Sequence, residues 1–84
     1  MGRTIGYTRP AARALTRMPP GTETRIREKL RLLAEKPEVL ANNVKALRGT
    51  EGHRLRVGDW RVIFTIEPDP IMVHDIGPRG SIYG

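Results

Sequence analysis

The stretch HRLRVGDWRVIFTIE, residues 53–67, decides the fold. Apolar and polar side chains alternate along it, and this two-residue period is typical of a β-strand. The alternation is interrupted at Gly58-Asp59, and a glycine in the first position of a two-residue turn suits the type II′ geometry. The stretch therefore predicts a β-hairpin that turns at residues 58 and 59.

The two-residue turn fixes which side chains of the hairpin share a face. The expected cross-strand pairs are Val57 with Trp60, Arg56 with Arg61, Leu55 with Val62, and Arg54 with Ile63. Alternation then gathers the apolar residues on one face, where we expect them to form the core: Leu55, Val57, Trp60, Val62, Phe64 and Ile66. The opposite face receives Arg54, Arg56 and Arg61.

Upstream of the hairpin, the sequence predicts a short strand and then a helix. Residues 3–8 alternate as a strand would, and Thr8 or Arg9 leads into a helix that has Pro10 in its first turn. The apolar residues Ala11, Leu15 and Met18 follow at the spacing of one helix face. The Pro-Pro-Gly sequence at residues 19–21 ends this helix.

A second helix and a last strand complete the predicted fold. The helix is expected to run from a Thr22 N-cap to about Lys36, with Ile26, Leu30 and Leu33 on its buried face. Residues 67–70 predict a turn, and residues 71–76 predict the strand that follows it. The fold class is therefore α+β, with an N-terminal strand, two helices packed on one face, and an antiparallel meander of three or more strands.

Length and composition limit the possible functions. The 84 residues suffice for one domain, spanning residues 1–84, and the absence of cysteine excludes disulfides and Cys-based metal sites. Lys and Arg total 15 against 9 Asp and Glu, and this net charge of +6 favours a polyanion as the partner. No apolar stretch is long enough for a signal or a membrane span, so a cytoplasmic protein is expected.

The basic residues are mostly arginines, 12 against 3 lysines. A GC-rich genome would explain this bias, but so would phosphate recognition, because a guanidinium presents paired donors to phosphate oxygens. In the hairpin, Arg56 and Arg61 face each other directly, although like charges in such pairs destabilise a sheet whose good pairs contribute only ~0.2–1 kcal/mol. With Arg54 beside them, they predict a phosphate-binding site; the alternative is a solvated sheet face.

Two segments resemble the RelE/ParE superfamily of toxins from type II toxin–antitoxin pairs. They are LRGTEGHRLRVGDWRVIF at residues 47–64 and IGPRGSIY at residues 76–83, and the likeness extends over almost the whole chain. The RelE branch implies a ribosome-dependent mRNA endonuclease that a cognate antitoxin holds inactive. The ParE branch implies a DNA gyrase inhibitor with the same fold, and a basic module that binds RNA or the ribosome without cleavage is a third interpretation.

The resemblance also implies roles for individual residues. Arg54 and Arg56 correspond to two RNA-binding lysines of the RelE branch, while Arg61, Arg79 and Tyr83 match its catalytic residues by type. Both strand lysines are replaced by arginine in this chain. Pro78 also stands where relatives often carry a basic residue or histidine.

These residues fit a cleavage in which the 2′-hydroxyl attacks the neighbouring phosphate, without a metal or other cofactor. Arg61 and Arg79 would stabilise the charge on the non-bridging oxygens, to which one well-placed group contributes ~3–4 kcal/mol. A guanidinium stays protonated at neutral pH and so cannot act as the general base. Tyr83 is the leading candidate for proton transfer or base stacking, although its ring could instead pack the C-terminal tail against the sheet.

The two histidines are not expected to take part in catalysis. By strand parity His53 lies on the core face, and His74 is expected to be structural.

Partner proteins are expected because one small sheet leaves both apolar and cationic surface uncovered. The resemblance implies an acidic, partly disordered antitoxin that binds the toxin in a hetero-oligomer, with the ribosome and mRNA as targets. Leu32, Leu40 and Val44 are candidate antitoxin contacts, and burial in the core is the alternative for each.

Overall fold

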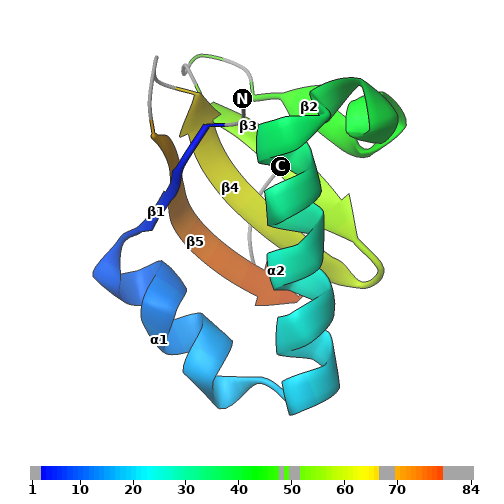
Figure 1. Ribbon diagram of the computed structural model, residues 1–84. Coiled ribbons are helices and arrows are strands. Elements are labelled where there is room, and N and C mark those ends of the chain that lie inside the picture. The colour runs from blue at the N-terminus through cyan, green and yellow to red at the C-terminus, as the bar shows by residue number, and fades with distance from the viewer. Residues whose placement is uncertain (1–2, 48, 50–51, 67–69, 79–84) are drawn as a thin grey trace.

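A five-stranded sheet with helices on one face forms the structure, a computed structural model that describes residues 3–47, 49, 52–66 and 70–78 (Figure 1). Its elements are β1 (Ile5–Tyr7), α1 (Arg9–Arg17), α2 (Pro20–Glu35), the 3₁₀ helix η1 (Pro37–Asn43), β2 (Val44–Ala46), β3 (Gly52–Val57), β4 (Trp60–Ile66) and β5 (Ile71–Pro78). The strand order across the sheet is β1-β5-β4-β3-β2. The predicted α+β class is therefore confirmed.

The hairpin of β3 and β4 has the predicted register. Val57 pairs with Trp60 and Arg56 pairs with Arg61, and the next two pairs also match the prediction. Gly58 has a φ of 60°, whereas Asp59 does not have a positive φ. This sign pattern agrees with a type II′ turn, in which only the first turn residue needs φ above zero.

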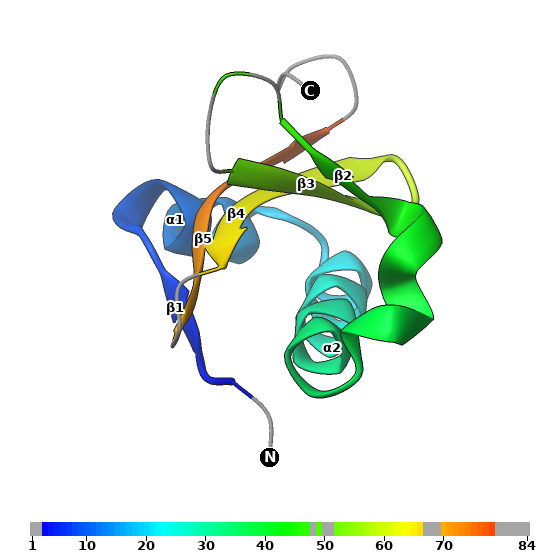
Figure 2. The ribbon, with the colours of Figure 1, turned by 90° about the horizontal axis from the view of Figure 1, so that it is seen from above.

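The helices cover one face of the sheet and enclose the core. Seen from above, α2 lies beneath the sheet, and within the described part of the chain no helix covers the opposite face (Figure 2). The core joins both helices to β3, β4 and β5, and its largest fully buried side chains are Phe64, Leu15, Ile26, Leu30, Leu55, Ile71, Val62 and Val73. Trp60 packs partly buried against this core, as predicted. Ile66 was expected in the core but is 43% exposed, because it ends β4 at the margin of the sheet.

Two edge strands differ from the predicted meander. β1 pairs in parallel with β5, so the sheet is mixed, and β2 adds an antiparallel strand beside β3. Neither β2 nor η1 was predicted. The predicted turn at residues 67–70 lies mostly outside the described residues.

The starts of the helices test the predicted caps. The hydroxyl of Thr8 accepts a hydrogen bond from the amide of Ala11 at 3.4 Å, so the predicted start of α1 is confirmed. The predicted Thr22 cap of α2 is wrong, since α2 begins at Pro20. Proline suits the first position of a helix because that position needs no N–H donor.

Two glycine substitutions are expected to change stability in opposite directions. Gly58→Ala places a side chain at positive φ and lowers the free energy of unfolding by about 1–2 kcal/mol. Gly21→Ala lies at the second residue of α2, where a Cβ meets nothing within 4 Å, and raises it by about 0.4–1 kcal/mol because alanine restricts the unfolded chain. Urea unfolding measures the change in the free energy of unfolding for each variant. Changes of the same sign and size in both variants would contradict the assigned turn geometry.

Candidate functional site

Cationic side chains gather on the face of the sheet opposite the helices. Arg54, Arg56 and Arg61, which alternation predicted to share this face, line one depression of about 230 Å³ together with Lys45, Asn42 and Asn43. We call this site the cationic depression. No acidic side chain of the described residues lines it.

Strand pairing brings the four cations together. Lys45 on β2 pairs with Arg54 on β3, and Arg56 on β3 pairs with Arg61 on β4. Both are pairs of like charge directly across an antiparallel ladder, an arrangement that destabilises a sheet. The cationic depression therefore lowers the stability of the strands that build it.

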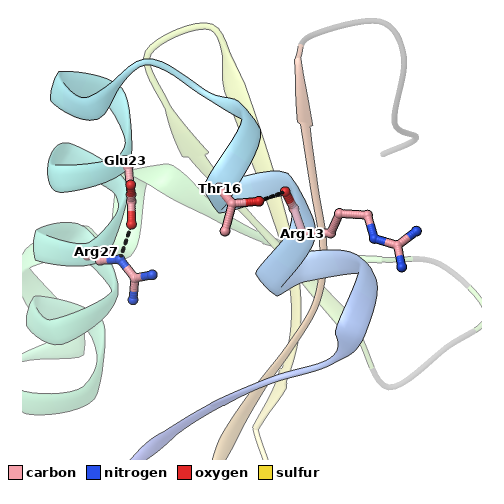
Figure 3. Close-up of polar contacts among 4 residues, drawn as sticks. All are labelled: Arg13, Thr16, Glu23 and Arg27. Atoms are coloured by element: carbon pink, nitrogen blue, oxygen red, sulfur yellow. Dashed lines mark hydrogen bonds and ion pairs between the residues drawn. The ribbon is translucent and has the colours of Figure 1, made fainter.

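The cations of the depression form no ion pair with any described residue. Among the described residues, the one ion pair joins Arg27 to Glu23 at 2.9 Å, on α2 at the other side of the sheet (Figure 3). Arg61 is held by neutral acceptors instead, because its Nη1 donates to the carbonyl oxygens of Trp60 at 3.1 Å and Gly58 at 3.3 Å. The turn thus orients this guanidinium without neutralising it.

Lys45, Asn42 and Asn43 are site residues that the sequence analysis missed. They come from η1 and β2, two elements that were not predicted. The alternation of Val44, Lys45 and Ala46 was a usable signal, since it resembles the alternation of the hairpin. This alternation covers only three residues, which is too short to distinguish a strand from a loop.

The remaining candidate residues divide as follows. His53 stacks on Phe64, with ring centroids 5.4 Å apart, and so lies on the core side as predicted. His74 is exposed at a β-bulge of β5, where its Nε2 is 2.9 Å from the hydroxyl of Thr65. Arg79 and Tyr83 lie outside the described residues, so their roles stay predictions.

The described residues contain neither a cluster of metal-ligating side chains nor a membrane-spanning helix. No three His, Asp or Glu side chains in that part of the chain lie together as metal ligands would. None of the described helices is long and apolar enough to cross a membrane.

Comparison with known proteins gives a family and a fold. Residues 5–83 match the family described as the ParE toxin of the type II toxin–antitoxin system parDE. The RelE–RelB complex from Pyrococcus horikoshii contains a chain 26% identical to this one, with a TM-score of 0.80 and coverage of 98% of this chain and 100% of that one. No curated protein matches the sequence.

More distant structures share the fold. The toxin–antitoxin complex RelBE2 from Mycobacterium tuberculosis has 21% identity and a TM-score of 0.79, covering 94% of this chain and 100% of that chain. The isolated RelE toxin of E. coli has 14% identity and a TM-score of 0.76, covering 95% of this chain and 87% of that chain.

The α+β fold is thus that of a small toxin. The chain belongs to the ParE toxin family of type II toxin–antitoxin systems, within the RelE/ParE superfamily, as its sequence motifs indicated.

The charge repulsion in the cationic depression predicts a stabilising substitution. Arg56→Thr removes the like-charged partner of Arg61 and introduces a residue that favours strands, so the free energy of unfolding should rise by about 0.2–1 kcal/mol. The gain should shrink in high salt, because salt screens exposed charges. Urea unfolding at low and high salt measures it, and a loss of stability in Arg56→Thr would show that Arg56 supports the fold.

Proposed function

We propose that this toxin is an mRNA endonuclease of the RelE type, acting in the cytoplasm on messages bound to the ribosome. The observation that carries the proposal is the cationic depression, which four cations line without a carboxylate among the described residues. A sheet gains no stability from such an arrangement, whereas the phosphates of an RNA strand would neutralise it. Arg54 and Arg56 hold the RNA backbone in this proposal, and Lys45 adds a further phosphate contact.

The cleavage we propose needs no cofactor. The 2′-hydroxyl loses its proton and attacks the adjacent phosphorus, the bond to the 5′-oxygen breaks, and that oxygen takes up a proton. The products are a 2′,3′-cyclic phosphate and a 5′-hydroxyl. Arg61 and Arg79 stabilise the negative charge that develops on the non-bridging oxygens, and Arg61 is already oriented by the carbonyl oxygens of Gly58 and Trp60.

Proton transfer falls to Tyr83 in this proposal. A guanidinium stays protonated at neutral pH and so cannot accept the proton of the 2′-hydroxyl. His53 is a poor candidate because it stacks on Phe64 at the core side of the sheet. A phenol can transfer the proton once nearby cations favour its ionised form.

We further propose a cognate antitoxin as the partner in a hetero-oligomer. The 26% identical chain from Pyrococcus horikoshii was crystallised as a RelE–RelB complex. Of the three predicted contacts, Leu40 is only 3% exposed and belongs to the core, so it is not available. Leu32 and Val44 are partly buried against the core and stay candidates for the edge of an antitoxin site.

Inhibition of DNA gyrase is the second candidate function. It is favoured by one observation, the match of residues 5–83 to the ParE toxin family. A gyrase inhibitor would leave messages intact and damage DNA, so the two candidates differ in what they destroy.

Brief induction in a host that lacks the antitoxin distinguishes the two functions. We expect mapped transcript 5′ ends to show cuts within translated codons. Arg61→Ala should lose them, since removing one oriented donor slows such reactions by about 10²–10³-fold. Lys29→Ala, an exposed cation on α2, is the matched control and should cut like the original chain. Intact messages together with DNA damage would instead establish the gyrase function.

Tyr83→Phe separates proton transfer from stacking. The phenylalanine ring can still stack on a base but has no hydroxyl, so cleavage should fall by about 10²-fold or more if the phenol transfers a proton. Single-turnover cleavage on programmed ribosomes measures the rate. A rate equal to that of the original chain, with Tyr83→Ala slow, would assign stacking to this ring.

A further inference from the structure

A second group of arginines lies on α1. Arg9, Arg13 and Arg17 recur every four residues, so they lie on one face of the helix, about 6 Å apart along its axis. All three are exposed, and they line a depression of about 430 Å³ whose other lining residues are Pro10, Ala14 and Asp75. We call these three arginines the α1 arginine row.

Helix stability does not account for the α1 arginine row. Like charges four residues apart destabilise a helix by about 0.2–0.5 kcal/mol per pair. Arg9, in the first turn, also lies at the positive end of the helix dipole, and α1 contains no acidic residue. On α2, by contrast, Arg27 pairs with Glu23, and the side chain of Arg13 extends from the side of α1 away from that pair (Figure 3).

Asp75 offsets at most one of the three charges of the row. Among the described residues it is the one acidic residue that lines this depression, and its Oδ1 accepts a hydrogen bond from the amide of Ile76 at 2.9 Å. Within the described ranges it forms no ion pair with Arg9, Arg13 or Arg17. In the described part of the chain, three cations therefore share a single carboxylate, which leaves two positive charges unbalanced.

The row lies across β5 from β4, the nearest strand that carries a residue of the cationic depression. Asp75 pairs with Ile63 and Gly77 pairs with Arg61, so Asp75 is two positions along β5 from the residue opposite Arg61. Strand geometry then separates the Cα atoms of Asp75 and Arg61 by roughly 8 Å. α1 packs against β5, which places the row across this strand from the depression.

We propose that the α1 arginine row binds the sugar–phosphate backbone of an RNA segment that flanks the segment in the cationic depression. This inference rests on the proposed function, since it names a second contact with the same RNA. Planar guanidinium groups suit phosphate oxygens, with which they form paired hydrogen bonds.

The surface of α1 favours RNA over a protein partner. A partner helix that binds in a groove uses apolar anchors, whereas arginine clusters bind phosphate or acidic groups. In the described part of the chain, the large apolar side chains that are exposed are Val39 and Ile66, and they lie on η1 and β4. The exposed residues of α1 are small or charged, which suits a charged backbone and gives a protein helix nothing apolar to cover.

Salt-dependent RNA binding tests the row. The probe is a short single-stranded RNA with 2′-O-methyl riboses, titrated by fluorescence anisotropy between about 50 and 200 mM salt. Each phosphate contact on a single strand contributes about 0.7 to the slope of log affinity against log salt, so Arg9→Ala/Arg13→Ala/Arg17→Ala should reduce the slope by about 2. Its affinity at low salt should fall by about tenfold or more.

A second triple variant, which removes the same number of positive charges from another part of the surface, controls for the change in net charge. Lys29→Ala/Arg31→Ala/Lys36→Ala removes three exposed cations from α2 and the residue after it, and should leave the slope nearly unchanged. Equal losses in both triple variants, or no loss in the α1 variant, would overturn the proposal. So would an α1 variant that binds RNA normally but has lost the antitoxin, because the row would then be a protein interface.

A lysine variant excludes an effect on folding. Arg9→Lys/Arg13→Lys/Arg17→Lys keeps the charges, so it should keep the salt slope while binding more weakly than the original chain, since lysine lacks the paired donors. A lysine variant that loses the slope while unfolding at the same temperature would also overturn the proposal.

The assay separates this inference from the nuclease proposal. The methylated ribose has no free 2′-hydroxyl, so the probe reports binding alone. If messages stay intact in the host but the row still sets the salt slope, the nuclease proposal fails and the row stands. If messages are cut and the row has no effect on the slope, the row fails and the nuclease proposal stands.

Discussion

The two-residue turn at Gly58-Asp59 is the constraint on which the rest of the structure depends. It sets the register of β3 and β4, and a slip of one residue would exchange the two faces of the hairpin. With the observed register, Leu55, Val57 and Val62 meet the helices, and the arginines lie on the uncovered face. The geometry of this turn thus determines which side chains of the hairpin are buried in the core and which are exposed to a ligand.

One face of the sheet packs against the helices, and the other exposes cationic side chains. The helical face is closed by apolar packing, with Phe64, Leu30 and Ile26 fully buried. The other face holds two cross-strand pairs of like charge, and among the described residues no carboxylate lines the depression that they form. Core packing therefore has to offset the repulsion on the far side, and a bound polyanion would relieve it. This division is why we attribute the cationic face to function rather than to folding.

Much of this arrangement could be predicted from the sequence, because its signals are local. Alternation and a glycine turn predicted the hairpin register, and the spacing of Ile26, Leu30 and Leu33 predicted the buried face of α2. The parallel pairing of β1 with β5 could not be predicted, because it joins residues more than sixty positions apart. Lys45 was missed for a related reason: it belongs to a three-residue strand that is defined only by its partner β3.

Nuclear magnetic resonance of the arginine side chains tests the central claim most directly. Uncleavable 2′-O-methyl RNA would be titrated into the toxin while the Nε–Hε signals are followed. We expect the signals of Arg54, Arg56 and Arg61 to shift together at substoichiometric RNA, whereas Arg27, paired with Glu23, should stay in place. Shifts confined to arginines elsewhere, with those three unchanged at saturation, would contradict the assignment of the cationic depression as the RNA site.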